Sequence, residues 1–210
     1  MKKVYLDNAS TTAMRPEVIQ VMVDCMAQDY GNPSSTHSLG RHAKSILELS
    51  RKSIAKALNA TAQEILFTSG GTEANNWILR SAVKDLKVRR IISSKMEHHA
   101  VLYPILELQK EFDIQVEYVE NSADGVLDLT HLVDLLSEST EKTLVSLMHV
   151  NNETGVVLDL ERVSQICQEH HALFHSDTVQ SVGKAILDLQ KVPIDFIVSS
   201  AHKFHGPKGV

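Results

Sequence analysis

Ile65-Leu66-Phe67-Thr68-Ser69-Gly70-Gly71-Thr72-Glu73 is the stretch of sequence that decides the fold. It begins as a β-prone run, turns at two glycines, and continues into an amphipathic pattern of helical length over residues 72–86. The same alternation of β-prone runs and amphipathic helical stretches recurs to the end of the chain. It predicts an α/β fold with a mainly parallel sheet flanked by helices on both faces. The other predicted strands are 90–93, 114–119, 143–150, 172–176 and 195–199, and the other helices are 99–111, 128–138 and 159–170.

The first 60 residues lack this alternation. A helix is predicted from Pro16, since proline favours the first helical position, and a second over residues 40–58. We therefore expect residues 1–60 to form an N-terminal helical arm and residues 61–210 to form one larger α/β unit.

Composition excludes several classes of protein. The chain has 210 residues, 43% of them hydrophobic, which is enough for a sizeable core. Its 21 Lys and Arg against 26 Asp and Glu give a net charge of −5, so no basic surface for nucleic acid or anionic membrane is expected. No apolar run is long enough to span a membrane, and no signal peptide precedes residue 7, which favours a cytoplasmic protein.

The cysteines and histidines indicate neither a disulfide nor a metal centre. Cys25 and Cys167 are far apart in sequence, and each falls on the apolar stripe of a predicted helix, so we expect two buried structural thiols. The 11 histidines show no spacing typical of metal ligands, and no metal site is expected.

Residues 68–73 could bind a phosphate. They follow a predicted strand and open a helix, where free backbone N–H groups, the helix dipole and hydroxyl groups together favour an anion. The alternative is an ordinary helix start with Ser69 or Thr72 as the N-cap.

Four other polar clusters follow predicted strands, and ligands of parallel sheets gather at the carboxyl ends of the strands. Each cluster also has a simpler interpretation, as a turn, a helix cap or a solvated lysine. The clusters are Glu97-His98-His99, His149 to Gly155, Asp177 with Gln180, and Ser199 to Gly206 around Lys203.

Taken together, the clusters match the needs of one cofactor. Pyridoxal phosphate requires an amine for a Schiff base, an acid beside its pyridine nitrogen, a phosphate cradle and a group that stacks on its ring. Lys203, Asp177, Gly71-Thr72 with Ser200, and His98 supply these four functions.

The chain resembles the N-terminal part of cysteine desulfurases, which belong to the class V aminotransferase-like, fold-type I pyridoxal phosphate enzymes. Seven motifs in family order carry the resemblance and cover nearly the whole chain. They are Tyr5 to Thr12, Gly31 to His37, Phe67 to Asn76, Glu97 to Ala100, Asn151 to Gly155, Asp177 to Gln180, and Ser200 to Gly209.

The resemblance implies a role for each site residue. Lys203 would form the Schiff base and move the substrate α-proton, and Asp177 would pair with the pyridine nitrogen. His98 would stack on the ring and assist proton transfer, while Gln180 would bind the ring hydroxyl.

Five further assignments follow from the resemblance. Thr72, Ser200 and His202 would hold the phosphate together with the amide of Gly71. Asn152 would orient the substrate carboxylate.

The reaction implied is conversion of L-cysteine to L-alanine, with the sulfur passed on as a persulfide for iron–sulfur cluster or thiolation pathways. A sulfur-acceptor or scaffold protein, and a homodimer or a complementary C-terminal chain, are the implied partners. The small domain and the sulfur-accepting cysteine of the family lie beyond the Lys203 motif, so we expect the 210 residues alone to be inactive and prone to aggregation. A selenocysteine lyase or other class V enzyme, and a truncated, non-catalytic cofactor-binding or assembly chain, are the alternatives.

Overall fold

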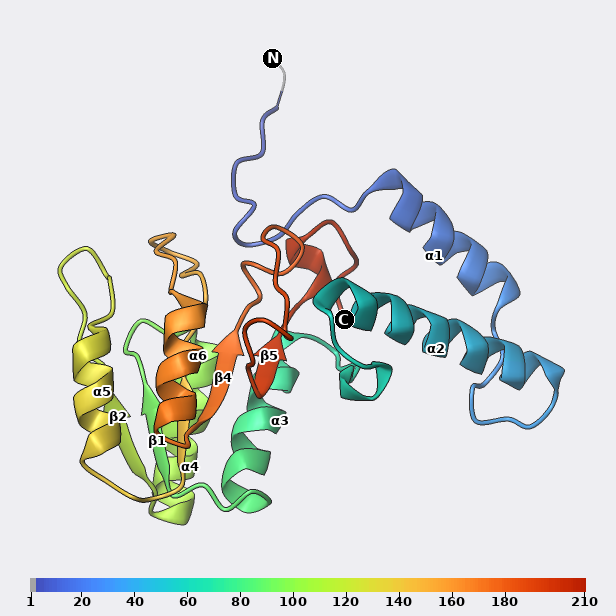
Figure 1. The fold of residues 1–210 in the computed structure, drawn as a ribbon. Coiled ribbons are helices and arrows are strands. Elements are labelled where there is room, and N and C mark those ends of the chain that lie inside the picture. The colour runs from blue at the N-terminus through green and yellow to red at the C-terminus, as the bar shows by residue number, and fades with distance from the viewer. Residues whose placement is uncertain (1–2) are drawn as a thin grey trace.

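The structure is a computed structural model that describes residues 3–210. Figure 1 shows the elements in chain order. They are α1 (Pro16–Gln28), α2 (Ser38–Leu58), a 3₁₀ helix (Ala62–Glu64), α3 (Gly71–Lys84), β1 (Arg90–Ser93), α4 (His99–Phe112), β2 (Gln115–Tyr118), α5 (Leu129–Ser137), β3 (Thr143–Ser146), α6 (Leu160–Glu169), β4 (Leu173–Asp177), β5 (Phe196–Val198) and a second 3₁₀ helix (Ala201–Lys203).

The five strands form one parallel sheet in the order β2-β1-β3-β4-β5. Ile91 of β1 pairs with Leu144 of β3, and Ser176 of β4 pairs with Ile197 of β5. The prediction of an α/β fold with a mainly parallel sheet is therefore confirmed. In this strand order the connections diverge between β1 and β3, which is where open α/β sheets bind ligands.

Helices cover both faces of the sheet (Figure 1). On one face, residues of α5 and α6 pack against Ile92, Val145 and Phe174. On the other face, residues of α3 and α4 pack against Ile91 and Leu144. Consecutive strand residues point to opposite faces, so a sheet buried on both sides needs apolar neighbours such as Ile91-Ile92.

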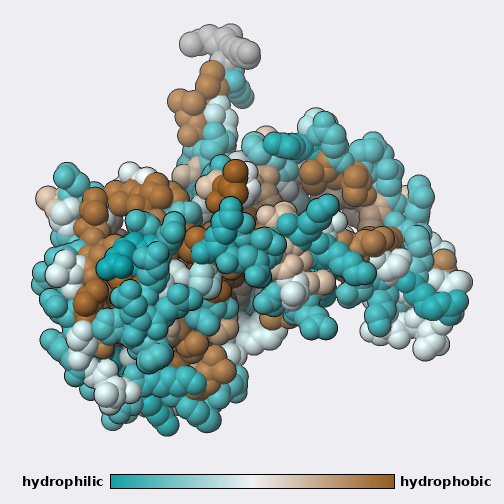
Figure 2. Space-filling model, in the orientation of Figure 1, coloured by the Kyte–Doolittle hydropathy of each residue, from teal (hydrophilic) through white to brown (hydrophobic). Residues whose placement is uncertain are grey.

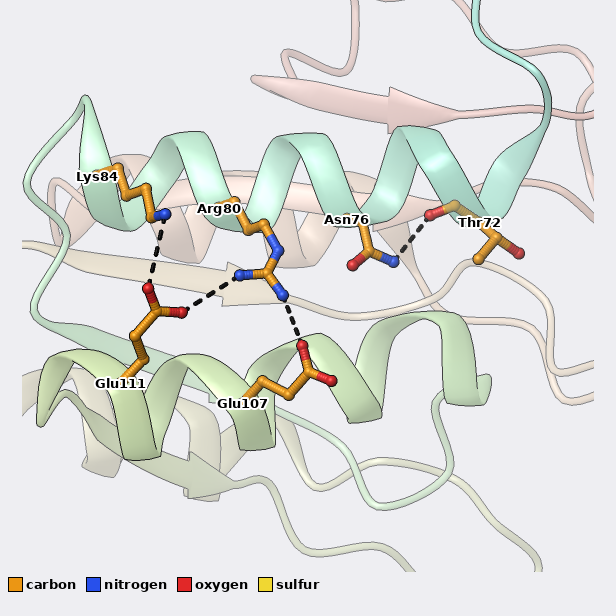
Figure 3. Close-up of polar contacts among 6 residues, drawn as sticks. All are labelled: Thr72, Asn76, Arg80, Lys84, Glu107 and Glu111. Atoms are coloured by element: carbon orange, nitrogen blue, oxygen red, sulfur yellow. Dashed lines mark hydrogen bonds and ion pairs between the residues drawn. The ribbon is translucent and has the colours of Figure 1, made fainter.

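Side chains on α3 and α4 also link the two helices at the surface (Figure 3). Arg80 of α3 pairs with Glu107 of α4 at 2.5 Å and with Glu111 at 3.4 Å. Lys84 adds a weaker pair to Glu111 at 3.7 Å. This network joins the helix that starts at Gly71 to the helix that starts at His99.

The predicted N-terminal helices are present, and α1 and α2 lie to one side of the sheet (Figure 1). No residue of α1 is buried, and hydrophobic residues are visible on this part of the surface in Figure 2. The prediction that Cys25 is buried is therefore wrong, because the described residues cover the apolar stripe of α1 only in part and leave Cys25 exposed. Cys167 is buried in α6, as predicted.

The strand predicted at residues 65–68 is also absent. The segment pairs with no strand of residues 3–210, and the Arg51 guanidinium donates to the Ile65 carbonyl and lies 4.9 Å from the Phe67 ring. The outer edge of β5 has no strand partner within residues 3–210. A cavity of about 870 Å³ is lined by residues of both the 64–68 segment and β5.

None of the helices described in residues 3–210 is both long and apolar enough to cross a membrane.

Candidate active site

A cleft of about 410 Å³ collects the polar segments that follow the strands. The loops after β1, β3, β4 and β5 all contribute to it, together with the start of α3 and residues 7–10 of the N-terminal segment. The predicted site residues all line this cleft: Gly71, Thr72, His98, Asn152, Asp177, Gln180, Ser200, His202 and Lys203.

The start of α3 can receive an anion. Gly70 has φ +145°, a conformation that favours glycine, and no side chain caps the helix. The Glu73 carboxylate does not cap the helix, because it accepts hydrogen bonds from the backbone amide and the hydroxyl of Ser69, both at 2.6 Å. The alternative of a helix capped by Ser69 or Thr72 is therefore wrong, and the first N–H groups of α3 keep their hydrogen-bonding capacity.

Ser200 and His202 line the same cleft, and Ser200 lies close to Gly71 at this helix start. Ser200 is buried at the end of β5, and its hydroxyl donates to the Val210 carbonyl at 3.3 Å. His202 Nδ1 is 3.1 Å from the Thr11 hydroxyl, and burial together with Lys203 and Lys208 lowers the pKa of His202.

Asp177 forms the floor of the cleft. It is 5% exposed, and its carboxylate accepts from Asn75 Nδ2 at 2.8 Å and from the Val179 amide at 3.0 Å. Burial raises the pKa of Asp177, while these two donors, His98 and Lys203 act in the opposite direction. A buried carboxylate held in this way is suited to pair with a cationic ring nitrogen.

His98 is the N-cap of α4, because its Nδ1 accepts from the Ala100 amide at 3.1 Å. The ring therefore carries its proton on Nε2. Burial, and secondarily His99, lowers the pKa of His98, so the ring is neutral near pH 7. A neutral, half-buried imidazole can stack on a planar ligand or exchange a proton with it.

Lys203 and Gln180 meet at one backbone carbonyl. Lys203 Nζ donates to the Ala9 carbonyl at 2.5 Å, and Gln180 Nε2 donates to the same oxygen at 2.7 Å. Burial, followed by the like charge of Lys184, lowers the pKa of Lys203, which increases its unprotonated, nucleophilic fraction at neutral pH. Asn152 also lines the cleft, and its amide donates to Glu153 Oε1 at 2.7 Å.

Asn75 and Ala9 line the cleft but were not among the predicted site residues. Asn75 is 1% exposed and holds Asp177; its position one helical turn after Thr72, on an otherwise apolar helix face, was the available signal. Ala9 receives Lys203 and Gln180 through its carbonyl oxygen, and a backbone contact leaves no signal in the sequence.

No group of three His, Cys, Asp or Glu side chains in residues 3–210 is arranged as a metal site.

Known proteins are similar to this chain in both sequence and fold. The family model described as Aminotransferase class-V matches residues 4–210. The chain is 41% identical to "Cysteine desulfurase IscS" of Dictyoglomus turgidum, an alignment that covers 100% of this chain and 53% of that protein. It is 41% identical to the protein of that name from Haemophilus ducreyi, over 99% of this chain and 52% of the relative. The chain thus spans about half the length of these curated relatives.

Solved structures agree with the sequence comparison. A "NifS-like protein" superposes with a TM-score of 0.94 at 38% identity, covering 99% of this chain and 57% of the other. A NifS-like protein from Rickettsia africae superposes with a TM-score of 0.87 at 34% identity, covering 99% and 56%. Class-V aminotransferases and cysteine desulfurases depend on pyridoxal phosphate. The chain belongs to the aminotransferase class-V family.

Proposed function

We propose that the cleft binds pyridoxal 5′-phosphate and that the chain is the cofactor-binding part of a cysteine desulfurase acting on L-cysteine. The observation that carries the proposal is the convergence of a lysine amine, a buried carboxylate, a neutral imidazole and an uncapped helix start on one cleft. These are the groups that the cofactor's aldehyde, ring nitrogen, ring face and phosphate require.

When bound, the cofactor supplies an electron sink that stabilises negative charge at the substrate α-carbon. Groups of the chain itself would transfer protons and hold the cofactor in place. Lys203 provides the amine and moves a proton at the α-carbon, and Asp177 keeps a proton on the ring nitrogen. The amides of Gly71 and Thr72, with Ser200 and His202, hold the phosphate.

The thiol that accepts sulfur is not supplied by the cleft. Neither Cys25 nor Cys167 lines it. Burial raises the pKa of Cys167 to about 12, which leaves almost no thiolate at neutral pH. Cys25 is exposed on α1, outside the cleft. We propose that the acceptor cysteine and the partners of the reaction belong to the complete enzyme, of whose relatives this chain spans about half.

A cofactor titration tests the proposal. The 210-residue chain should develop a visible absorbance band with pyridoxal phosphate, and Lys203→Ala should abolish it. Asp177→Asn should weaken binding by about tenfold or more, since it removes a charge-assisted contact. Lys110→Ala, an exposed lysine on α4, is the matched control and should behave like the parent chain. An unchanged band in Lys203→Ala would contradict the proposal.

A further inference from the structure

Two loops meet at the point where the sheet connections diverge. The first loop, residues 94–98, follows β1 and ends at His98; the second, residues 147–155, follows β3 and carries Asn152. Strands β1 and β3 are neighbours in the sheet, so the two loops form adjacent walls of the cleft. The spacing between those walls decides what fits between His98 and Asn152.

Two hydrogen bonds fasten these loops to each other. Glu97 Oε1 accepts from the Met148 amide at 2.8 Å. Asn151 Nδ2 donates to the Met96 carbonyl at 2.9 Å. The Asn151 amide is fixed in this orientation, because its Oδ1 accepts from the backbone of the residues that follow it, Glu153 at 2.9 Å and Thr154 at 2.8 Å.

Glu97 is buried, at 6% exposure, and its second carboxyl oxygen, Oε2, has no hydrogen-bond partner within residues 3–210. No lysine, arginine or histidine in those residues forms an ion pair with it. A buried side chain with an unpartnered oxygen is costly, and it persists only where the contact it makes is needed.

We propose that Glu97 is a positioning residue that fastens the His98 loop to the loop after β3 and so sets where the His98 ring lies in the cleft. Its functional meaning rests on the proposed cofactor site, because His98 is the group expected to stack on the cofactor. The contact itself is a property of the chain alone and can be tested without cofactor.

Burial favours the uncharged form of the Glu97 carboxyl. Burial raises the pKa of Glu97 well above its ordinary value; the hydrogen bond from the Met148 amide acts in the opposite direction, and the negative charge of Asp177 raises the pKa further. An ionised Glu97 would place a second negative charge beside Asp177 and make it harder for Asp177 to stay ionised. The groups that face His98 are His99, Asp177, Lys203 and Glu153.

Three substitutions separate contact from charge. Glu97→Gln keeps the length and the acceptor oxygen but cannot ionise. Glu97→Asp keeps the carboxyl but withdraws it by one methylene, beyond reach of Met148. Glu97→Ala removes both. If Glu97 positions the loop as a neutral group, Gln restores the parent behaviour and Asp does not. If its charge mattered, Asp would be the better replacement.

The first readout is amide hydrogen exchange, resolved to Met148 by mass spectrometry. Loss of the hydrogen bond should speed exchange of this amide by about tenfold in Glu97→Ala and Glu97→Asp. Glu97→Gln should stay within about twofold of the parent chain. The same substitutions at Glu169, exposed on α6 at the opposite face of the sheet, are controls and should leave Met148 unchanged.

The second readout is the pKa of His98, measured from the pH dependence of exchange at the imidazole C2 position. Burial lowers this pKa in the parent chain, so release of the loop in Glu97→Ala should raise it toward the ordinary value, whereas Glu97→Gln should not move it.

A third readout is the dependence of the unfolding free energy on pH. Because the raised pKa of a buried acid costs stability as pH rises, Glu97→Gln should gain stability relative to the parent as pH rises above the ordinary carboxyl value of 4.5.

The proposal is overturned if Glu97→Gln behaves like Glu97→Ala, or if Glu97→Asp matches the parent while Gln does not. None of these readouts needs the cofactor. A parent chain that keeps Met148 protected but forms no Lys203-dependent absorbance band would therefore contradict the proposed function and leave the loop contact supported.

Discussion

Lys203 is unusual among the lysines of this chain because its amine faces groups of both signs within a partly buried cleft. Asp177 and Asp7 favour its charged form, while burial and Lys184 oppose it more strongly. Lys184 lies on the loop after β4, and its amine also donates to Gln180 Oε1 at 3.1 Å. The position of Lys184 therefore affects both the reactivity of Lys203 and the orientation of the Gln180 amide.

We predict that Lys184→Met raises the pKa of Lys203, because it removes a positive charge that disfavours a second one nearby. The unprotonated fraction of Lys203 at a given pH should fall, and with it the rate of reaction with an aldehyde. Competitive labelling of amines over a pH series, read peptide by peptide, measures this pKa directly. Lys184→Arg keeps the charge and should restore the parent value; a Lys203 pKa unmoved by Lys184→Met would show that the coupling is absent.

His175 is a second residue whose burial has a measurable consequence. The ring is fully buried in β4, with Nδ1 2.9 Å from the Ser146 hydroxyl, and burial lowers its pKa from 6.5 to about 3. Below pH 6.5 the unfolded chain binds a proton at this residue that the folded chain does not, so stability falls as the solution is acidified.

Replacing His175 with Gln should remove that loss. Relative to His175→Gln, the parent chain should lose about 1.4 kcal/mol of unfolding free energy for each pH unit below 6.5. Denaturant unfolding at several pH values measures the slope, and His99→Gln, at an exposed site, is the control. Parallel stability profiles for the parent and His175→Gln would contradict the assignment.

At this scale, the sequence revealed which residue types the cleft needs but not how each is held. Lys203 and Asp177 could be selected because each follows an apolar strand. Burial of Cys25 could not be judged in the same way, because an apolar stripe shows that a helix has a face to cover but not whether the chain itself covers it.

At the scale of elements, the cleft depends on how α3 and α4 lie against each other. The start of α3 carries amides that no side chain caps, His98 is the N-cap of α4, and the network of Figure 3 joins the outer surfaces of the two helices. Arg80 is 34% exposed and Glu107 is 63% exposed, so water and salt screen the pair and its contribution is small.

A double-mutant cycle between Arg80→Ala and Glu107→Gln should give a coupling of about 0.5 kcal/mol in low salt, reduced in high salt. Thermal or denaturant unfolding of the four proteins supplies the numbers. Arg80 and the distant Glu169 should show no coupling. A salt-independent coupling of about 2 kcal/mol or more would mean that the pair is desolvated in solution, against the exposure found here.

The predicted strand at 65–68 shows why some elements cannot be found from sequence. Its residues are apolar and β-branched or aromatic enough to favour an extended backbone, and Ile65 does have extended dihedral angles. A strand also requires a neighbour to pair with, and local composition contains no information about that neighbour. Strands β1 to β4 were predictable because each is an apolar run next to a helical pattern, although the order of the strands in the sheet, with β1 rather than β2 beside β3, does not follow from that alternation.

At the scale of the whole molecule, residues 3–210 combine a sheet buried on both faces with apolar surfaces and a strand edge that stay exposed. The uncovered surfaces are α1, which buries no residue, the outer edge of β5, and the apolar cavity beside it. On α1 alone, Val21 is 66% exposed and Met26 is 70% exposed. Exposed strand edges and apolar surfaces of this kind promote association between chains.

We therefore predict that the isolated 210-residue chain associates with itself in a concentration-dependent way. Light scattering coupled to size exclusion, at several protein concentrations, measures the mass in solution. A double variant in which Val21 and Met26 are both replaced by lysine should associate less and keep the sheet unchanged. A chain that stays monomeric and melts cooperatively at every concentration would contradict this prediction.

The central claim is that the cleft is a pyridoxal phosphate site whose covalent anchor is Lys203. The most direct test is to mix the chain with the cofactor, reduce it with borohydride, and map the modified peptide by mass spectrometry. We expect one phosphopyridoxyl group per chain, fixed on Lys203 and lost in Lys203→Ala. Modification spread over surface lysines, with Lys203 no more labelled than Lys110, would contradict it.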